Sequence, residues 1–523
     1  MFKISTLILL LLLSTMFSSC DSFLKEDVPD RIELDKYFND EEEAVKFLYG
    51  GYSAVKNTVF GFSLLAVTDL MTDDMDFAST DISRKGLCFL TFDPKNKYLK
   101  EVWGNFYAVI EQMNILLDKI EKNPSILNTS GNSIIAEARF IRGWAYFNLV
   151  QLWGNVPLVT IPTYSITKDN IYPKRSDREV IYGQITNDLA YAAAQLPDDP
   201  STITTTQGLS YPLTIKRAAA KLLLAKVYLA QKQYKDVLDE LNYFFIDNPA
   251  KFSLSEYNTL FDTPYKTTPE RKNEVIWEME ADAVSGFNNK LHREMAPAEM
   301  KGWKGETLVG ITTGYQNFIP TVDLFSSFSP MDKRYRYLYQ FSKSAPDSRP
   351  AIRKGYDILA SNQDLGGANC VLLRYADALL IEAEALNELG DPAAAKPYVD
   401  QIRQRAGLPV LSEGLNQQNM RDSIMMERRH EFAHEGYRLY DLRRTGTYMQ
   451  VMTQYAINNN IDADQTREFV DPRWTTTPDK NKLTVKIPFV SGNKNPQEKH
   501  LLHPIPADEL IANPNLAPNN TGY

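Results

Sequence analysis

The chain has 523 residues, of which 43% are hydrophobic, and a formal net charge of −9 at pH 7. This length supports a large buried core, and an acidic balance without a basic stripe argues against a nucleic-acid partner. Three cysteines in so long a chain exclude a disulfide-stapled scaffold.

The N-terminus has the pattern of a secretory leader. Lys3 gives a positive start, and residues 4–17 form an apolar run that is too short to span a bilayer, which needs about twenty residues. The run ends in Phe-Ser-Ser-Cys20, which is similar to the bacterial lipobox. We therefore expect a lipoprotein signal peptide over 1–19 and a lipid anchor on Cys20. Ordinary signal cleavage beside an incidental cysteine is the alternative.

Helical periodicity marks several long segments in the first third of the chain. Residues 40–56 begin with acids suited to a helix N-terminus, and residues 100–122 place Trp103 and other large side chains on one stripe. Residues 133–153 predict another long helix, which Gly154 ends. At this spacing we expect the aromatic side chains to belong to the core rather than to a ligand platform.

Two later segments, 220–249 and 372–407, have the pattern of tetratricopeptide helix pairs, with small and aromatic residues at the places typical of that repeat. The pairs are far apart in the sequence, so we expect no simple tandem array. Between them, over about 251–369, Gly, Pro, Thr, Asn and aromatic residues dominate and predict irregular, loop-rich structure. A second irregular stretch covers 458–499.

The segment 427–444 supports two incompatible interpretations, of which the first is catalytic. His430, Glu431 and His434 form H-E-x-x-H, in which two imidazoles bind zinc beside a carboxylate that activates water. A catalytic zinc also needs a third protein ligand. No histidine follows nearby, and the next glutamate after Glu435 is Glu468. We therefore predict no metal and no cofactor, and place a zinc metallopeptidase last among the alternatives.

The second interpretation is structural. Glu427, Glu431 and Glu435 recur every four residues and would share one helix face, where like charges destabilise unless they are neutralised. Several arginines, including Arg428 and Arg429, lie in the same turns. We expect a carboxylate–guanidinium network that clamps this helix to its neighbours and keeps the acids ionised.

The same segment, read as E-R-R-x-E-x-x-x-E-G-x-R-x-x-D-L-R-R, resembles the C-terminal signature of the SusD-like (RagB/SusD) outer-membrane lipoproteins. Other parts of the chain are similar to the same family. They are the mature start after Cys20, the phrase A-E-A-R-F-I-R-G-W-A-Y-F-N-L-V-Q-L-W-G-N-V-P-L-V over 136–159, the segment 318–334 and the ending from His503. Agreement at such separated places is more specific than any single motif.

This resemblance implies an all-α framework of the SusD-like fold, with divergent tetratricopeptide-type helix pairs and long irregular, loop-rich insertions. An N-terminal helical region would cover 20–250. A C-terminal region with the loop-rich insertion and a helix pair would cover 251–523. Members of the family are not enzymes, so no catalytic residue is expected.

The resemblance also implies a function at the outer membrane. A SusD-like protein covers a SusC-type TonB-dependent transporter as a lid. It captures an oligomeric nutrient at the cell surface and delivers it to the transporter for import. Most relatives serve glycan-utilisation systems and a minority bind peptides, so peptide capture is the alternative to glycan capture. A scaffold that binds only proteins, through its helix pairs, is a further possibility.

Glycan capture requires flat aromatic faces for the sugar C–H surfaces and polar groups for the hydroxyls. Trp303 is the first choice, because glycines and lysines flank it and cannot bury it well. In relatives, the early loop around residue 73 often faces the ligand. The predicted ligand-binding residues are Trp303, Tyr315, Asn317, Trp474, Asp73 and Asp74.

The remaining cysteines leave one question open. With Cys20 assigned to the anchor, only Cys88 and Cys370 remain. The sequence allows either one disulfide between them or two buried thiols.

Overall fold

The structure is a computed structural model. It describes residues 37–77, 79–127, 131–167, 171–199, 201–204, 210–261, 263–284, 288–296, 314–315, 317–334, 339–341, 350–355, 357, 359–360, 364–459, 466–470, 482–486 and 494–523. The predicted signal peptide, Cys20, Trp303 and Trp474 lie outside these residues.

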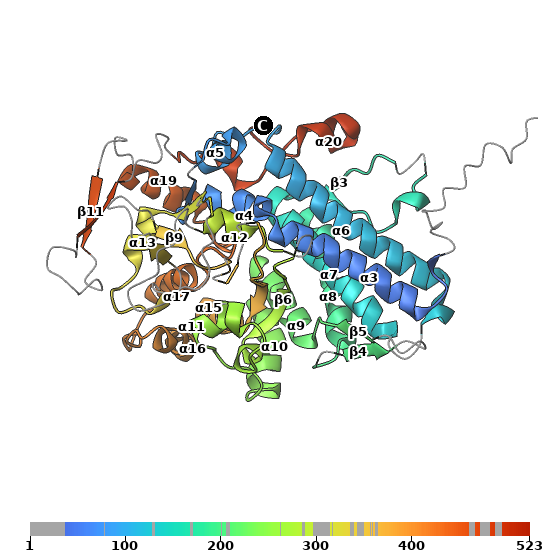
Figure 1. Cartoon of the computed structure of the whole chain (residues 1–523), viewed down its shortest axis with the longest axis horizontal. Helices are drawn as coiled ribbons and strands as arrows, with labels where there is room; N and C mark the ends of the chain where they lie inside the picture. The colour runs from blue at the N-terminus through green and yellow to red at the C-terminus, as the bar shows by residue number, and fades with distance from the viewer. Residues whose placement is uncertain are drawn as a thin grey trace, which may run out of the picture.

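Long helices build the N-terminal part of the molecule (Figure 1). They are α3 (Glu41–Phe60), α6 (Lys97–Lys122), α7 (Gly131–Trp153) and α8 (Arg178–Gln195), and the short α4 (Phe62–Thr68) follows α3. α6 packs against α3 and α7, and α7 packs against α8. Asp40 caps α3 by accepting a hydrogen bond from the backbone N–H of Glu43, as a side chain at this position commonly does.

These helices confirm the periodicity predicted for residues 40–56, 100–122 and 133–153. Their large aromatic side chains belong to the core, as expected, because Trp103, Trp144 and Trp153 are all buried. α7 ends before Gly154, whose φ of +74° lies in the left-handed region that glycine adopts readily.

The two predicted helix pairs are present and lie together. The first is α9 (Arg217–Ala230) with α10 (Tyr234–Asn242), and the second is α15 (Tyr375–Glu388) with α16 (Pro392–Arg405). α15 contacts both α9 and α10, so pairs that are far apart in the sequence are neighbours in space. Asp391 begins α16 by accepting from the N–H of Ala394.

Shorter helices fill the rest of the chain: α5 (Ile82–Cys88), α11 (Tyr257–Phe261), α12 (Leu291–Met295), α13 (Val322–Ser327), α17 (Gln417–Glu431), α18 (Arg438–Arg444), α19 (Tyr448–Asn459) and α20 (Ala507–Ala512). The segment 251–369 contributes only short elements to the described structure, as its composition predicted. α17 packs on α15 and α16, so it continues the stack of helix pairs.

The strands form two-stranded antiparallel ladders. They pair β1 (Met75–Phe77) with β7 (Phe318–Pro320), β6 (Val275–Met279) with β10 (Cys370–Arg374), β2 (Val156–Pro157) with β3 (Arg175–Ser176), β4 (Ser201–Thr204) with β5 (Ser210–Leu213), β8 (Tyr339–Phe341) with β9 (Pro350–Ile352), and β11 (Thr466–Val470) with β12 (Lys482–Lys486). In the first ladder Met75 lies opposite Pro320 and Phe77 opposite Phe318. This pairing fixes the early loop to the loop-rich insertion.

One hydrophobic cluster runs through the molecule and includes both Phe38 and Leu516. The C-terminal tail closes it, since Trp153 Nε1 donates to Pro504 O at 2.9 Å and Asn520 Nδ2 donates to Trp153 O at 2.9 Å. The end of the chain consequently lies beside α5 and α20 (Figure 1).

No single helix in the described parts of the chain is both long and apolar enough to cross a membrane. Residues 41–60 and 62–71 pass that test only jointly, as a pair bent by 54°. Many side chains of this pair, such as Val45, Leu48 and Leu70, are buried inside the protein.

Both remaining cysteines are free thiols, which decides between the two alternatives that the sequence left open. Cys88 is buried at the end of α5, and Cys370 is half-buried at the start of β10.

Candidate functional site

A buried ionic cluster surrounds the last residue of α17, Glu431. Its carboxylate accepts hydrogen bonds from Arg374 at 2.5 Å, from Arg334 at 3.3 Å, from the Tyr257 hydroxyl at 2.8 Å, and from Arg405. Burial alone would raise the pKa of Glu431, but the guanidinium groups of Arg405, Arg374 and Arg334 hold it well below its usual range. The acid therefore stays ionised, as predicted.

The other glutamates of the motif extend this cluster. Glu427 pairs with Arg334 at 2.7 Å, and Glu435 pairs with Arg374 at 2.9 Å. Lys354 donates to Glu435 at 2.6 Å and to the backbone oxygen of Glu431 at 2.9 Å. The predicted carboxylate–guanidinium network is thus present, and it joins α17 to β10 and to residues of the loop-rich insertion. The arginines expected to neutralise the glutamates are not their partners, because Arg428 pairs with Asp377 and Arg429 with Asp74.

One expectation about this segment is wrong. The three glutamates do not share a continuous helix face, because α17 ends at Glu431 and Glu435 follows in a turn. His434 and Gly436 have φ values of +62° and +80°, and left-handed residues of this kind end a helix.

The H-E-x-x-H histidines are consequently not placed one helical turn apart. His430 lies in α17, where its Nε2 is 2.8 Å from Ser327 Oγ and its ring stacks on Phe328 with centroids 4.3 Å apart. Burial lowers the pKa of both His430 and His434. Among the described residues, no group of three or more His, Cys, Asp and Glu side chains could hold a metal ion.

The early loop is held from inside by arginines. Arg438 Nε and Nη2 donate to the two carboxylate oxygens of Asp73 at 2.9 and 2.8 Å, and Arg429 Nε donates to Asp74 at 2.6 Å. Burial opposes ionisation of Asp73, but Arg429 and Arg438 lower its pKa below the usual value. Both carboxylates are buried, at 2% and 1% exposure, so their contacts within the protein fix the position of the loop.

A lysine from the C-terminal part completes this support. Lys494 Nζ donates to the backbone oxygens of Thr72 at 2.8 Å and Leu70 at 3.3 Å, and it pairs with Asp76 at 3.0 Å. Because β1 follows directly and pairs with β7, the loop in turn positions the chain around residue 317.

At that place Tyr315 reaches the surface and is 49% exposed. The Arg293 guanidinium lies 5.5 Å from the centroid of its ring and pairs with Asp364 at 3.0 Å. Asn317 Nδ2 donates to Glu294 Oε2 at 2.7 Å, next to Arg293 in α12. We call Tyr315, Arg293 and Asp364 the Tyr315 surface.

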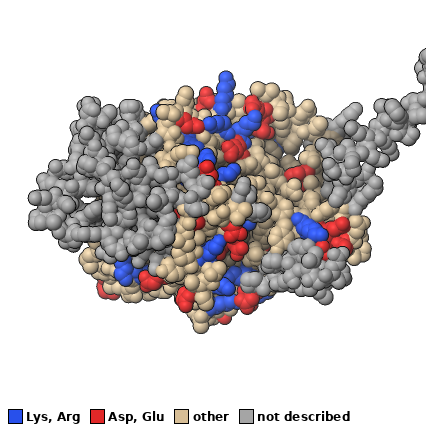
Figure 2. All heavy atoms as spheres, in the orientation of Figure 1, with Lys and Arg blue, Asp and Glu red and all other residues tan. Residues whose placement is uncertain are grey.

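Charge on the visible face of the molecule is mixed. Figure 2 shows acidic and basic side chains interspersed over its described part, without a broad patch of one sign. This agrees with the modest net charge and gives no sign of a strongly charged ligand on that face.

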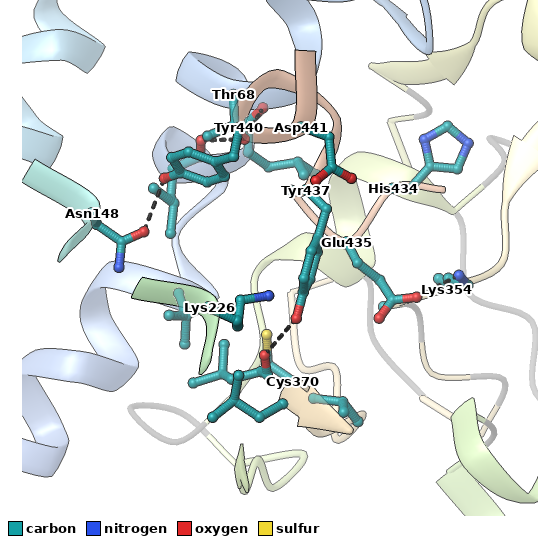
Figure 3. A pocket seen from close by; sticks show the side chains of 18 of the residues that line it. Thr68, Asn148, Lys226, Lys354, Cys370, His434, Glu435, Tyr437, Tyr440 and Asp441 are labelled. Atoms are coloured by element: carbon teal, nitrogen blue, oxygen red, sulfur yellow. Dashed lines mark hydrogen bonds and ion pairs between the residues drawn. The ribbon is translucent and has the colours of Figure 1, made fainter. Parts of the chain in front are cut away.

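A cavity of about 190 Å³ lies among α4, α7, α9, β10 and the turn that follows α17 (Figure 3). Leu291 and Met295 of α12 line it. Its polar side chains are largely engaged with one another: Tyr440 donates to Asn148 Oδ1 at 2.9 Å, and Tyr437 donates to a backbone oxygen of β10 at 2.9 Å. The sulfur of Cys370 points into the same space (Figure 3).

Known protein families match both ends of the chain. A model described as the SusD family matches residues 333–523, and a model described as "Starch-binding associating with outer membrane" matches residues 23–229. The chain belongs to the SusD family. It is 26% identical to SusD-like protein P2 of Formosa agariphila, over 100% of this chain and 99% of that relative.

Solved structures of SusD proteins share its fold. A SusD superfamily protein from Bacteroides vulgatus superposes with a TM-score of 0.71 at 22% identity, covering 93% of this chain and 100% of that one. A laminarin binding SusD-like protein superposes with a TM-score of 0.69 at 23% identity, covering 92% and 100%. The predicted SusD-like fold with an all-α framework is therefore confirmed.

Within this SusD fold the structure brings some predicted ligand-binding residues together. Tyr315 and Asn317 adjoin β7, and Asp73 and Asp74 adjoin its partner β1. As ligand contacts they remain predictions, as do Trp303 and Trp474. Sequence reasoning missed Arg293 and Asp364, because no pattern links two charges that are 71 residues apart.

Proposed function

We propose that the protein is a non-enzymatic, cell-surface lipoprotein that captures an oligo- or polysaccharide and delivers it to a SusC-type TonB-dependent transporter. Its family membership supports this, together with the starch-binding and outer-membrane description of the model that matches the N-terminal part. A relative of the same fold is named as laminarin binding. Cys20 would carry the lipid anchor.

The observation that carries the proposal is the Tyr315 surface. A half-exposed tyrosine offers a flat face for sugar C–H groups, and the adjoining Arg293 and Asp364 offer a donor and an acceptor for hydroxyls. By contrast, the described tryptophans, Trp103, Trp144, Trp153 and Trp277, are all buried.

The remaining predicted residues take two roles in this proposal. Trp303 and Trp474 would add aromatic platforms. Asp73 and Asp74 would act as positioning residues, because their carboxylates bind arginines while their loop holds β1 against β7. Asn317 would hold α12 through Glu294 and thereby orient Arg293.

Affinity electrophoresis and isothermal titration against a polysaccharide panel test the proposal. We expect one glycan class to bind, regardless of EDTA, and Tyr315→Ala and Trp303→Ala each to raise Kd about two- to tenfold, as lost aromatic contacts do. Tyr172→Ala is the matched control, because Tyr172 has a similar exposed fraction of 51% but lies beside the C-terminal tail.

Other results would replace the proposal. If the protein binds a peptide pool and binds no glycan of the panel, it is a peptide-capturing member of the family. Metal-dependent hydrolysis of any substrate would make it an enzyme. Association with the transporter is tested separately, by co-purification of the full chain with a TonB-dependent transporter from its own cells.

A further inference from the structure

The cavity of Figure 3 is distinct from the Tyr315 surface, although α12 borders both. Leu291 and Met295 of α12 line the cavity, whereas the partly exposed Arg293 of the same helix lies over the ring of Tyr315. The proposed glycan function makes no use of this space, which is partly open to solvent.

Its size suits one small molecule. Protein interiors are close-packed, and a void larger than a few waters is uncommon. A cavity of about 150 Å³ with apolar walls stays dry and holds benzene. The cavity here, at about 190 Å³, has room for a single ring with a short substituent.

Charges in the cavity wall are already neutralised inside the protein. Lys226 pairs with Asp377, and Lys354 pairs with Glu435. Arg444 binds Glu384 in the same way. An ionic occupant would find no free counter-charge, so the occupant must be uncharged.

A sugar is a poor match for the same wall. Each sugar hydroxyl needs a hydrogen-bonding partner when it is buried. The hydroxyls of Tyr437 and Tyr440 already donate to Leu372 O and to Asn148. Much of the remaining wall is apolar and includes leucine side chains from α4 and α9.

Aromatic rings gather around the cavity from several elements. Trp144 and Phe147 come from α7, and Phe261, Tyr437 and Tyr440 come from the C-terminal part. Such rings favour an aromatic guest through edge and face contacts. From its size, its paired charges and these rings, we propose that the cavity binds one small uncharged aromatic molecule, independently of the glycan.

A cysteine in the cavity wall can report whether the cavity is occupied. Cys370 is a free thiol whose sulfur points into the cavity (Figure 3). Cys88 is also free, but it is fully buried in another part of the core. Burial raises the pKa of the Cys370 thiol to about 12, so its labelling is slow enough to follow over time.

The experiment labels the full chain with iodoacetamide at about pH 9, with p-cresol or indole as the probe, and reads each cysteine by peptide mass spectrometry. At a probe concentration ten times its Kd, we expect Cys370 to react about tenfold more slowly. Cys88 is the internal control for global unfolding, which the probe also slows because it stabilises the folded state. Cys370 must therefore react faster than Cys88 without the probe, which shows that it reacts from the folded state and that its slowing reports direct cover.

A substitution provides a second readout. Cys370→Met places extra atoms in the cavity and should abolish the rise in Tm that the probe causes, whereas Cys370→Ala leaves the space and should keep it. The proposal is overturned if Cys370 reacts equally fast with and without the probe, or if the probe stabilises Cys370→Met as much as wild type. Protection of Cys370 by the bound glycan would also overturn it, because the cavity would then belong to the glycan site.

Discussion

At the scale of single residues, Glu431 shows how one side chain can hold several segments together. Its carboxylate receives hydrogen bonds from three arginines and a tyrosine that come from four separate parts of the chain. Each arginine side chain is buried, so this negative charge, together with their other carboxylate partners, offsets the cost of leaving water.

Replacing Glu431 by Gln should therefore lower the free energy of unfolding by about 3–5 kcal/mol, because three buried guanidinium groups lose the counter-charge that they share. Urea denaturation measures the change. Glu413→Gln is the control, since Glu413 pairs with Lys396 at a position that is 87% exposed and should change stability by less than about 1 kcal/mol. Equal midpoints for the two variants would contradict the structural role given to Glu431.

A second buried acid makes stability depend on pH. Glu137 is fully buried in α7, accepts hydrogen bonds from the Tyr52 hydroxyl and from the backbone N–H of Ile215, and has its pKa raised from 4.5 to about 8 by burial. A raised folded pKa means that the folded state holds the proton more tightly, so stability present below pH 4.5 is lost as pH rises towards 8.

Glu137→Gln should remove this loss, because the amide resembles the protonated acid and does not ionise. We expect the variant to match wild type near about pH 5 and to exceed it by roughly 2–5 kcal/mol near about pH 9. Denaturant midpoints for both proteins across this range provide the measurement. A constant difference between them at all pH values would show that Glu137 does not titrate in this window.

At the scale of elements, the loop before β1 is a short segment with many supports. Arg429 and Arg438 bind its carboxylates, and Lys494 binds its backbone oxygens. Because β1 pairs with β7, these contacts also position β7 and the Tyr315 surface beside it. The loop has little secondary structure of its own, so these polar contacts keep it in place.

Lys494→Met should loosen this loop, because buried backbone oxygens lose their donor. We expect a loss of about 2–4 kcal/mol in stability, faster hydrogen exchange over residues 69–77 and weaker glycan binding. Lys85→Met is the control, since Lys85 is exposed on the neighbouring α5. Unchanged exchange in this loop would mean that the arginines suffice to hold it.

Elements also show where sequence reasoning succeeds. The spacing of apolar residues and the residue types at the helix ends predicted α3, α6 and α7, because both signals are local in the sequence. The end of α17 was missed, although Gly436 marked it, because the evenly spaced glutamates suggested a longer helix. The partners of Glu431 were also beyond reach, since Arg374 is 57 residues away and their contact depends on the tertiary fold.

At the scale of the whole molecule, distant parts of the chain share one core. The helix pairs α9–α10 and α15–α16 stack together, and the C-terminal tail packs on α7. The cavity arises from this assembly, because its walls come from both halves of the sequence. No local pattern could predict it, and the same is true of the contact between Tyr315 and Arg293.

Asn520 provides a test of how strongly the tail supports the N-terminal helices. Its amide donates to Trp153 O and His503 O, and its oxygen accepts from Arg175. Asn520→Ala should cost about 2–4 kcal/mol, and calorimetry should still show one transition because the core is shared. Asn515→Ala, at an exposed place in the same tail, should change Tm little. Two separate transitions in wild type would argue against a shared core.

The ionic cluster around Glu431 also limits how this protein can evolve. A single substitution at Glu431, Arg374 or Arg405 leaves a buried charge without one of its partners. A paired substitution by apolar side chains of similar volume can leave the stability nearly unchanged. Natural variants should therefore alter these positions together or not at all. In an alignment of descendants, the strongest covariation should link residues that the linear sequence keeps far apart.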